Sequence, residues 1–420
     1  MDNLQFLHSK IAHYIELNWR KSFNEPTGQL HFKFLDPAAA YRAQLWDWDS
    51  YFCSVALADV YDDTALYTEG CVRNFLSYAR ADGSIPYMIN AGCNKMEALP
   101  ELNLKERGKE CDFNSIKPLL AQMLLLSFKK TNNSAFMRES YEKLQRHISH
   151  WEETQQSANK LFVWRSYRGS GTDNHPALYG RPLNSCAGVE LNSFMYLEYM
   201  AMSEIAEICG FENDSAEYKN KAEMLADAVN EHMWDCIDGL YYHLDMTSSK
   251  PPLAHQDISW DVPLKFRTWT CFAPMYAKFA PKDYADRMVR EHIINSGEFW
   301  SEYGIRTLAK NEKVYNTEET TNPSNWQGPI WIVSNYIIFK GLINYGYNDI
   351  AKKLCKNLLS NLYNDITKNG AMHEYYNPEN GSSNINLGFM NWNALAGIMV
   401  PELKNSLKKA GSSENEIKNL

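Results

Sequence analysis

The sequence predicts an all-α protein folded as an (α/α)6 toroid, a closed ring of six inner and six outer helices. Apolar residues recur at helical spacing along the whole 420-residue chain, whereas the alternating pattern of strands is rare and short. Long and short connections alternate between the predicted helices, and helices that are apolar on all sides alternate with amphipathic ones. This double alternation favours a closed ring over the alternative architecture, an open helical solenoid.

The periodicity predicts twelve helices, whose ends it defines to within about 2 to 4 residues. They span residues 2–22, 47–61, 63–80, 115–130, 134–155, 189–209, 215–234, 266–279, 282–294, 327–345, 347–363 and 390–402. Asp214 and Glu217 resemble a capping box, which places the start of the seventh helix at residue 215. The connections at 23–46, 81–114, 156–188, 235–265, 295–326 and 364–389 are long, so we expect all six at one end of the ring.

Two neighbouring helices illustrate the inner and outer classes. Segment 115–130 is apolar on nearly every side and is predicted to be buried, whereas 134–155 carries charged residues on one face. No Pro-, Ser- or Gly-rich linker divides the chain. We therefore expect a single domain at 1–403 and a C-terminal tail at 404–420.

Composition excludes several classes of function. Acidic residues outnumber basic ones by 51 to 42, and no basic run stands out, so nucleic acid is not expected as a partner. No stretch approaches the roughly 18 apolar residues of a membrane span, and the first residues lack a signal-peptide pattern, which favours a cytoplasmic location. Nine scattered cysteines without a Cys-x-x-Cys pair are expected to be reduced thiols. The eleven histidines show no metal-ligand spacing, so no metal or cofactor is predicted.

Aromatic residues reach 13% of the chain, with 12 Trp and 25 Tyr, which suits a carbohydrate-binding cleft. The first candidate cluster contains Trp46, Asp47, Trp48 and Asp49. Indoles stack on the C–H face of a pyranose, and carboxylates accept hydrogen bonds from its hydroxyls. The alternative is that one of these aspartates caps the helix that follows.

Two further clusters offer carboxylates in long connections. Gly169 and Gly171 allow a tight backbone path that would hold Asp173 in a cavity, where aromatic neighbours would keep its carboxyl protonated. Asp173 is thus a candidate general acid, with an ordinary turn as the alternative. Glu374 precedes two tyrosines and a turn, and it is either a base acting on water or a solvated loop residue. Stretches 325–331 and 388–393 would add stacking and amide contacts, or simply pack at helix starts.

Five motifs carry a resemblance to glycoside hydrolase family 63. They are Trp46-Asp47-Trp48-Asp49-Ser50, Ser170-Gly171-Thr172-Asp173-Asn174, Gly188-Val189-Glu190-Leu191-Asn192, Trp326-Gln327-Gly328-Pro329-Ile330-Trp331 and the segment from Glu374 to Gly381. The resemblance covers roughly residues 40 to 400. It implies the clan of inverting α-glycosidases with (α/α)6 toroids, to which trehalases also belong.

The resemblance also implies roles for individual residues. Asp173 would be the general acid, Glu374 the general base, and Asp49 a ligand of the sugar hydroxyls. The other residues expected to bind substrate are Trp46, Trp48, Lys117, Arg168, Trp326, Gln327, Trp331 and Tyr376. In an inverting enzyme the two catalytic carboxyls stand ~6.5 to 9.5 Å apart, and the chemistry requires no metal or cofactor.

The chain begins its first predicted helix at once, which is similar to the compact branch of mannosylglycerate and glucosylglycerate hydrolases. Candidate partners for a substrate carboxylate in or beside the long connections are Arg42, Lys117, Arg168, Arg181 and Arg306. Where relatives often carry Gln-Pro-Pro, this sequence has Ile116-Lys117-Pro118, a departure that affects the expected substrate but not the acid and base.

The predicted activity is therefore exo-acting, inverting hydrolysis of a small α-glucoside or α-mannoside, either a glucosylglycerate- or mannosylglycerate-like solute or a short oligosaccharide. Three alternatives remain open. One is a trehalase-like disaccharide hydrolase. Another is a sugar epimerase or isomerase that uses a pair chosen from His175, His243, His255 and His373. The last is a carbohydrate-binding toroid without activity.

Overall fold

The computed structural model describes residues 3–58, 60–92, 103–106, 109–246, 261–318 and 323–412, with the backbone alone at 103–106 and 109–113. Its α-helices are α1 (Asn3–Asn18), α2 (Asp47–Leu57), α3 (Thr64–Ser77), α4 (Leu120–Thr131), α5 (Ser134–Gln155), α6 (Val189–Cys209), α7 (Glu212–His232), α8 (Ala273–Ala277), α9 (Lys282–Arg287), α10 (Ile332–Asn344), α11 (Asn348–Asn369) and α12 (Ala396–Lys409). The protein is mainly helical, in agreement with the sequence.

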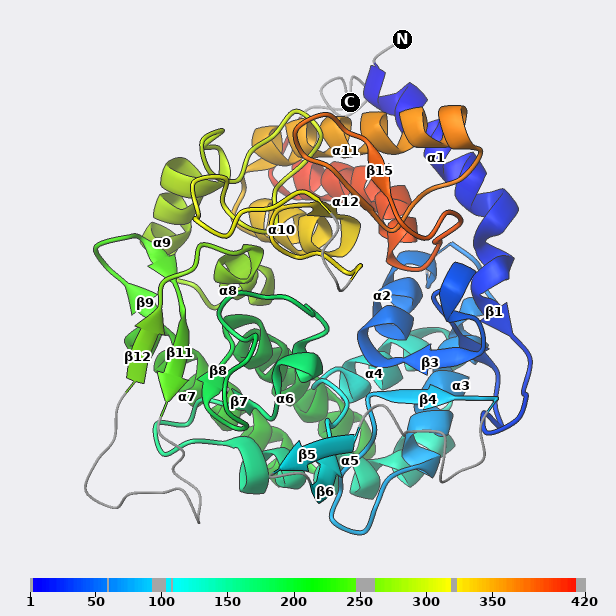
Figure 1. Cartoon of the computed structure of the whole chain (residues 1–420). Coiled ribbons are helices and arrows are strands. Elements are labelled where there is room, and N and C mark those ends of the chain that lie inside the picture. The colour runs from blue at the N-terminus through cyan, green and yellow to red at the C-terminus, as the bar shows by residue number, and fades with distance from the viewer. Residues whose placement is uncertain are drawn as a thin grey trace.

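Around the middle of the molecule, alternate helices of the described chain follow one another as an inner ring (Figure 1). Contacts run from α2 to α4, α6, α8, α10 and α12 in turn, and α12 returns to contact α2. The other long helices pack outside this ring: α3 on α4, α5 and α7 on α6, and α11 on α10 and α12, while α1 covers α11 and α12. Each inner helix follows a long connection, as the alternation of loops predicted.

A polar layer crosses the interior of the ring. Tyr51 donates a hydrogen bond to Gln122 (3.1 Å), and Gln122 donates to the buried carboxylate of Glu198 (3.2 Å). On the opposite side, Tyr336 donates to Glu402 (3.0 Å). Tyr276 hydrogen-bonds with Tyr51 and completes the layer. Each inner helix contributes one member: Tyr51 from α2, Gln122 from α4, Glu198 from α6, Tyr276 from α8, Tyr336 from α10 and Glu402 from α12.

Several helix ends differ from the predicted ones for identifiable reasons. The helix predicted at 115–130 begins at Leu120, because Pro118 disfavours helical backbone before it and supplies no amide hydrogen. The helix predicted at 327–345 begins at Ile332, because the two residues before it form a strand. The capping-box prediction was wrong: α7 begins at Glu212, and Asp214 accepts a hydrogen bond from Tyr141 (2.8 Å) instead.

Two other ends differ as well. The helix predicted at 266–279 is reduced to a 3-10 turn at Trp269–Phe272 followed by the short α8. The last helix begins with a 3-10 turn at Trp392–Leu395 and continues to Lys409, so the first part of the predicted tail is helical. By contrast, α9 continues as a π-helix at Met288–Ile293 and fills the predicted range.

The long connections contain short strands that the sequence pattern did not predict. They are β1 (Phe23–Asn24), β2 (Phe34–Leu35), β3 (Gln44–Trp46), β4 (Met88–Asn90), β5 (Asn103–Glu106), β6 (Lys109–Phe113), β7 (Val163–Trp164), β8 (Cys186–Ala187), β9 (Trp234–Asp235), β10 (Leu240–Tyr241), β11 (His243–Met246), β12 (Asp261–Leu264), β13 (Ile330–Trp331), β14 (Tyr375–Tyr376) and β15 (Ser383–Asn384). Strands this short cannot display an alternating pattern.

The antiparallel pairings tie long connections to one another at the rim of the ring. The largest sheet has the order β12-β11-β8-β7, and a smaller one has the order β13-β14-β15. In the smaller sheet Trp331 pairs with Tyr375, so the residue before Tyr375, Glu374, is held beside the start of α10. The remaining pairs are β1-β2, β3-β4, β5-β6 and β9-β10.

No helix in the described part of the chain is long and apolar enough to cross a membrane. Of the seven cysteines whose side chains are described, all are free thiols and Cys236 alone is exposed. Cys93 and Cys111 lie outside the residues whose side chains are described.

Candidate active site

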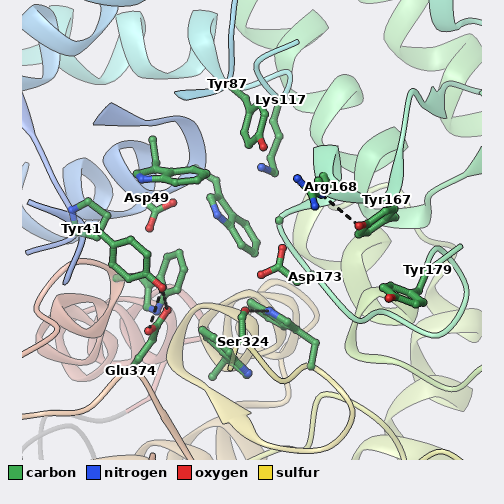
Figure 2. A pocket seen from close by; sticks show the side chains of 17 residues that line it. Tyr41, Asp49, Tyr87, Lys117, Tyr167, Arg168, Asp173, Tyr179, Ser324 and Glu374 are labelled. Carbon is green, nitrogen blue, oxygen red and sulfur yellow. Dashed lines mark hydrogen bonds between the residues drawn. The ribbon is translucent and has the colours of Figure 1, made fainter. Parts of the chain in front are cut away.

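A cavity of about 420 Å³ lies where the long connections meet at the starts of the inner helices (Figure 2). Nine of the predicted site residues line it: Trp46, Trp48, Asp49, Lys117, Arg168, Asp173, Trp326, Trp331 and Glu374. The remaining lining residues are Pro37, Tyr41, Tyr87, Tyr167, Gly171, Tyr179, Ser324 and Trp392. Residues far apart in the sequence are thus brought into one site.

Two predicted binding residues, Gln327 and Tyr376, do not line the cavity. Gln327 donates a hydrogen bond to the main-chain oxygen of Asn174 (3.0 Å) and so supports the loop that carries Asp173. Tyr376 is fully buried and donates to Asp365 (2.8 Å). Both side chains therefore contact residues outside the cavity lining and do not face the cavity themselves.

The start of α2 places two carboxylates in very different surroundings. Trp46 occupies the N-cap position, so neither aspartate is the N-cap residue, although Asp47 Oδ1 accepts a hydrogen bond from the main-chain amide of Trp48 in the first turn (2.7 Å). Asp47 is fully buried and accepts hydrogen bonds from Lys117 Nζ (3.0 Å) and from the Lys117 main-chain amide (2.9 Å). The Lys117 ammonium also lies 4.9 Å from the centre of the Trp48 ring. The charge of Lys117 is therefore largely compensated before any ligand binds.

Asp49 lies two residues further on and has no cationic partner as close among the described residues. Its Oδ1 accepts a hydrogen bond from Asn391 Nδ2 (2.6 Å), and the residue is only 6% exposed. Burial raises the pKa of Asp49 well above its usual value, and the charge of Asp47 raises it further, while Lys117 acts in the opposite direction. Asp49 thus presents a buried carboxyl to the cavity.

The loop that carries Asp173 packs closely against the aromatic wall. After a 3-10 turn at Tyr167–Ser170, Gly171 adopts a φ of +74°, and a Cβ there would lie 2.9 Å from the Trp48 ring. A larger residue would therefore push this loop off the indole. Asn174 accepts a hydrogen bond from the main-chain amide of Trp326 (2.7 Å), which anchors the other side of Asp173. The half-buried carboxyl of Asp173 points into the cavity (Figure 2).

Glu374 faces the same cavity from the strand side. Its carboxylate accepts hydrogen bonds from Asn386 Nδ2 (2.5 Å) and from Tyr41 OH (3.4 Å). Burial raises the pKa of Glu374 to about 7; the two hydrogen-bond donors oppose this shift, and the negative charge of Asp173 adds to it. A carboxyl with a pKa near neutrality is suited to proton transfer.

Indole rings form much of the cavity wall. Trp326 and Trp331 are stacked with their centroids 4.0 Å apart, and Trp48 meets the edge of Trp392 at 5.3 Å. These rings come from the starts of α2 and α10 and from the turn before α12. They provide flat apolar faces beside the carboxylates, as a pyranose ring requires.

Of the five cations proposed for an anionic ligand, Lys117 and Arg168 line the cavity. Arg168 is exposed and donates to the Tyr167 hydroxyl (3.2 Å). Arg181 and Arg306 form ion pairs with carboxylates that do not line the cavity. Arg42 is exposed and lies outside the cavity lining.

The histidines proposed for an epimerase do not line the cavity where the structure describes them. His175 and His243 are buried against each other, and His373 lies 3.0 Å from Asp365. His255 lies outside the described residues. Proton abstraction by a facing histidine pair therefore finds no support among the described residues.

Three residues that contact the carboxylates were not predicted from the sequence: Tyr41, Asn386 and Asn391. Asn391 lies in a stretch considered for stacking and amide contacts, but nothing in the sequence linked it to Asp49. Tyr41 and Asn386 lie in irregular connections without a motif, and they meet Glu374 only through the closed ring. Their sequence separation removes any local signal.

Carboxylates and indoles around one cavity, at the loop end of a helical ring, are typical of carbohydrate-processing enzymes. The family model described as the mannosylglycerate hydrolase MGH1-like glycoside hydrolase domain matches residues 42–393. The chain belongs to this family of glycoside hydrolase domains, and so to glycoside hydrolase family 63.

Similar proteins include a mannosyl-oligosaccharide glucosidase of Arabidopsis thaliana and a mannosylglycerate hydrolase of Rubrobacter radiotolerans. The Arabidopsis protein is 24% identical, and the match covers 56% of this chain and 31% of that protein. The Rubrobacter protein is 23% identical, and the match covers 46% of this chain and 39% of that protein. The chain thus spans about a third of the length of the curated relatives it matches.

Solved structures are similar over most of the chain. The mannosylglycerate hydrolase of Thermus thermophilus, in complex with glucose, is 17% identical, with a TM-score of 0.69 over 94% of this chain and 99% of its own. The neutral trehalase Nth1 of Saccharomyces cerevisiae is 16% identical, with a TM-score of 0.64 over 87% and 73%. At these identities the likeness establishes the shared fold.

Replacement of Lys117 by Met is expected to reduce the free energy of unfolding by about 3–5 kcal/mol, because it leaves Asp47 charged and unpaired in the interior. Urea denaturation measures the change, and Lys129→Met, at an exposed position of α4, serves as the control. The double variant Asp47→Leu/Lys117→Met should recover much of the loss. Equal stability of Lys117→Met and the control would contradict this account of the pair.

Proposed function

We propose that the protein is an exo-acting, inverting α-glycosidase that hydrolyses a small α-glucoside or α-mannoside. The observation that carries the proposal is the placement of Asp173 and Glu374 on different walls of one aromatic cavity (Figure 2). We also infer that the ring of alternating inner and outer helices is the (α/α)6 toroid predicted from the sequence. A cytoplasmic location remains a prediction.

In the proposed mechanism Asp173 is the general acid and donates its proton to the glycosidic oxygen as the bond to the anomeric carbon breaks. Glu374 is the general base and takes a proton from the water that attacks the opposite face of that carbon. Water adds its hydroxyl to the sugar, and the leaving group departs as an alcohol. The hydrogen bonds that Asn386 and Tyr41 donate to Glu374 stabilise its ionised form, which supports its role as the base.

The sugar to be released would occupy the part of the cavity between Glu374 and Asp49. Asp49 and its partner Asn391 offer an acceptor and a donor to the hydroxyls, and the indoles offer apolar faces. A cavity of about 420 Å³ lies toward the small end of the range for ligand sites, which supports a small glycoside.

The leaving group would lie beyond Asp173, where Lys117 and Arg168 line the wall (Figure 2). Lys117 is paired with Asp47, while Arg168 lines the wall with a guanidinium group, whose planar fork can bind a carboxylate such as glycerate through two hydrogen bonds. The Rubrobacter and Thermus relatives, named as mannosylglycerate hydrolases, support an anionic leaving group. A short neutral oligosaccharide is the second candidate, supported by the similarity to the Arabidopsis glucosidase.

Substitution of either catalytic candidate, Asp173→Ala or Glu374→Ala, is expected to lower kcat by about 10²- to 10⁴-fold. NMR-monitored hydrolysis of α-glucosides and α-mannosides, charged and neutral, identifies the substrate. The β-anomer should be released first. Glu302→Ala, an exposed loop carboxylate, serves as the control. Release of the α-anomer first would contradict inversion, and full activity in either alanine variant would refute that residue's assignment.

The pH dependence should reveal the base. Because Glu374 must be ionised to accept a proton, kcat/KM should fall as the pH drops through a pKa of about 7. Asn386→Ala removes a donor that stabilises the carboxylate, so the pKa of Glu374 rises and the acidic limb moves up by about 1 pH unit. Leu387→Ala, an exposed neighbour, should leave the limb in place. A limb that does not move, or moves to lower pH, would contradict the assignment.

Arg168→Ala tests the charge of the leaving group. With glucosylglycerate or mannosylglycerate as substrate, kcat/KM should fall about 10- to 100-fold, because a charge-assisted hydrogen bond is lost. The uncharged glycosylglycerol should lose less than about 3-fold, since it has no carboxylate to bind. Arg42→Ala is the matched control, because Arg42 is exposed and does not line the cavity. An equal loss on both substrates would count against an anionic leaving group.

A further inference from the structure

A cluster of fully buried polar side chains lies behind the loop that carries Asp173. Its members are His175, Glu190, His243, Thr268 and Thr270, each no more than 3% exposed. They come from four separate segments: the Asp173 loop, the first turn of α6, strand β11, and the turn before α8. None of them lines the cavity, and the proposed mechanism gives none of them a chemical role. This histidine cluster therefore calls for another explanation.

The hydrogen bonds assign the protonation state of both histidines. The main-chain amide of Ala177 donates to His175 Nδ1 (3.2 Å), and that of Val189 donates to His243 Nδ1 (2.9 Å). A nitrogen that accepts a hydrogen bond carries no proton, so each imidazole is neutral and protonated at Nε2. Burial also lowers the pKa of both histidines to about 3, which agrees with the neutral form.

Both Nε2–H groups have acceptors within the cluster. His175 Nε2 lies 3.2 Å from Thr268 Oγ1, while His243 Nε2 lies 3.3 Å from Thr270 Oγ1 and 3.4 Å from Glu190 Oε2. The Oγ1 atoms of Thr268 and Thr270 share a hydrogen bond of 2.6 Å. The cluster is thus a connected network that joins the four segments.

The same assignment argues against a metal in the cluster. The two Nε2 atoms are 3.3 Å apart, but protonated nitrogens have no lone pair to offer a cation. Within the described residues, no group of three histidine, cysteine, aspartate or glutamate side chains is arranged to hold a metal ion. Hydrogen bonds connect the histidines and threonines of the network, while Glu190 Oε2 accepts no hydrogen bond from the described residues and lies 3.4 Å from His243 Nε2.

We propose that His175 and His243 are positioning residues that fix the direction in which Asp173 presents its proton. This inference rests on the proposed role of Asp173 as the general acid. His175 follows Asp173 by two residues. The residue between them, Asn174, accepts a hydrogen bond from the Trp326 main-chain amide and donates one to Asn325 (3.0 Å). The chain is thus anchored to the cavity wall at Asn174 and to the interior at His175, while Gly171 abuts Trp48 on the other side.

The proposed role has a distinctive chemical consequence. A general acid matters most when the leaving group is a poor one, such as the alkoxide of a sugar or glycerate. Fluoride leaves a glycosyl fluoride with far less help from a proton donor. A misdirected Asp173 should therefore slow the cleavage of a glycoside and spare the fluoride of the same sugar, whereas general damage to the fold slows both equally.

The test uses the full chain and compares kcat/KM for the α-glycoside found in the NMR screen with that for the corresponding α-glycosyl fluoride. His175→Leu and His243→Leu should each lose about 10- to 100-fold on the glycoside, part of what a general acid contributes, and less than about 3-fold on the fluoride. His175→Gln keeps an N–H near the position of Nε2 and should recover most of the glycoside activity. His147→Leu removes a buried histidine of α5, distant in sequence from this loop, and should leave the ratio of the two rates unchanged.

Asp173→Ala serves as the reference. If it slows both substrates equally, the assignment of the acid fails, and with it this part of the proposed function. If Asp173→Ala is selective for the glycoside but the leucine variants keep the wild-type ratio, the positioning role alone is overturned. Because the readout is a ratio, partial unfolding of a variant changes both rates and does not imitate the expected result.

Discussion

The closure of the inner ring, where α12 packs against α2, is the contact from which the cavity follows. It brings together residues at opposite ends of the chain: Asn391 donates to Asp49 across 342 positions of sequence, and Tyr41 donates to Glu374 across 333. Each inner helix begins after a long connection, so its first turn and the preceding loop face the same opening. An open arrangement of the same helices would separate these groups.

At the site, the free-energy cost of burying a carboxylate is offset differently for Asp47, Asp49 and Glu374. Asp47 and Asp49 belong to one helical turn, yet Asp47 has an ion pair with Lys117, whereas Asp49 accepts a hydrogen bond from the Asn391 amide and has no ion pair among the described residues. A charge with a close cation remains stable in the interior, whereas one without such a partner has its pKa raised by burial. Glu374 is also held without a cation, and the amide and phenol that contact it limit the rise. The site thus contains a structural carboxylate, Asp47, beside two others, Asp49 and Glu374, that can exchange protons or hydrogen bonds.

Predictions from the sequence succeeded where the signal is local and repeated. The apolar surface of α4, the charged face of α5 and the alternation of loops all depend on residues close in sequence, and these features place the helices correctly. The clustering of tryptophan and aspartate before α2 likewise marked a site. Errors arose where a tertiary contact competes with the local pattern. Asp214 accepts a hydrogen bond from Tyr141 instead of capping the start of a helix. Ile330 and Trp331 pair with a distant strand instead of extending α10.

The chain's helical periodicity, its turn chemistry and its motif residues were enough to indicate a helical ring and the identity of nine cavity residues, because these are properties of neighbouring positions. The sequence did not indicate the surroundings of those residues, because burial and hydrogen bonding arise between segments that meet only when the ring closes. Tyr376, placed in the site from its motif, turns away toward Asp365, and Asn386, in no motif, reaches Glu374. The pKa of Glu374 and the neutral histidine cluster behind Asp173 belong to this second class, since each depends on water excluded by packing.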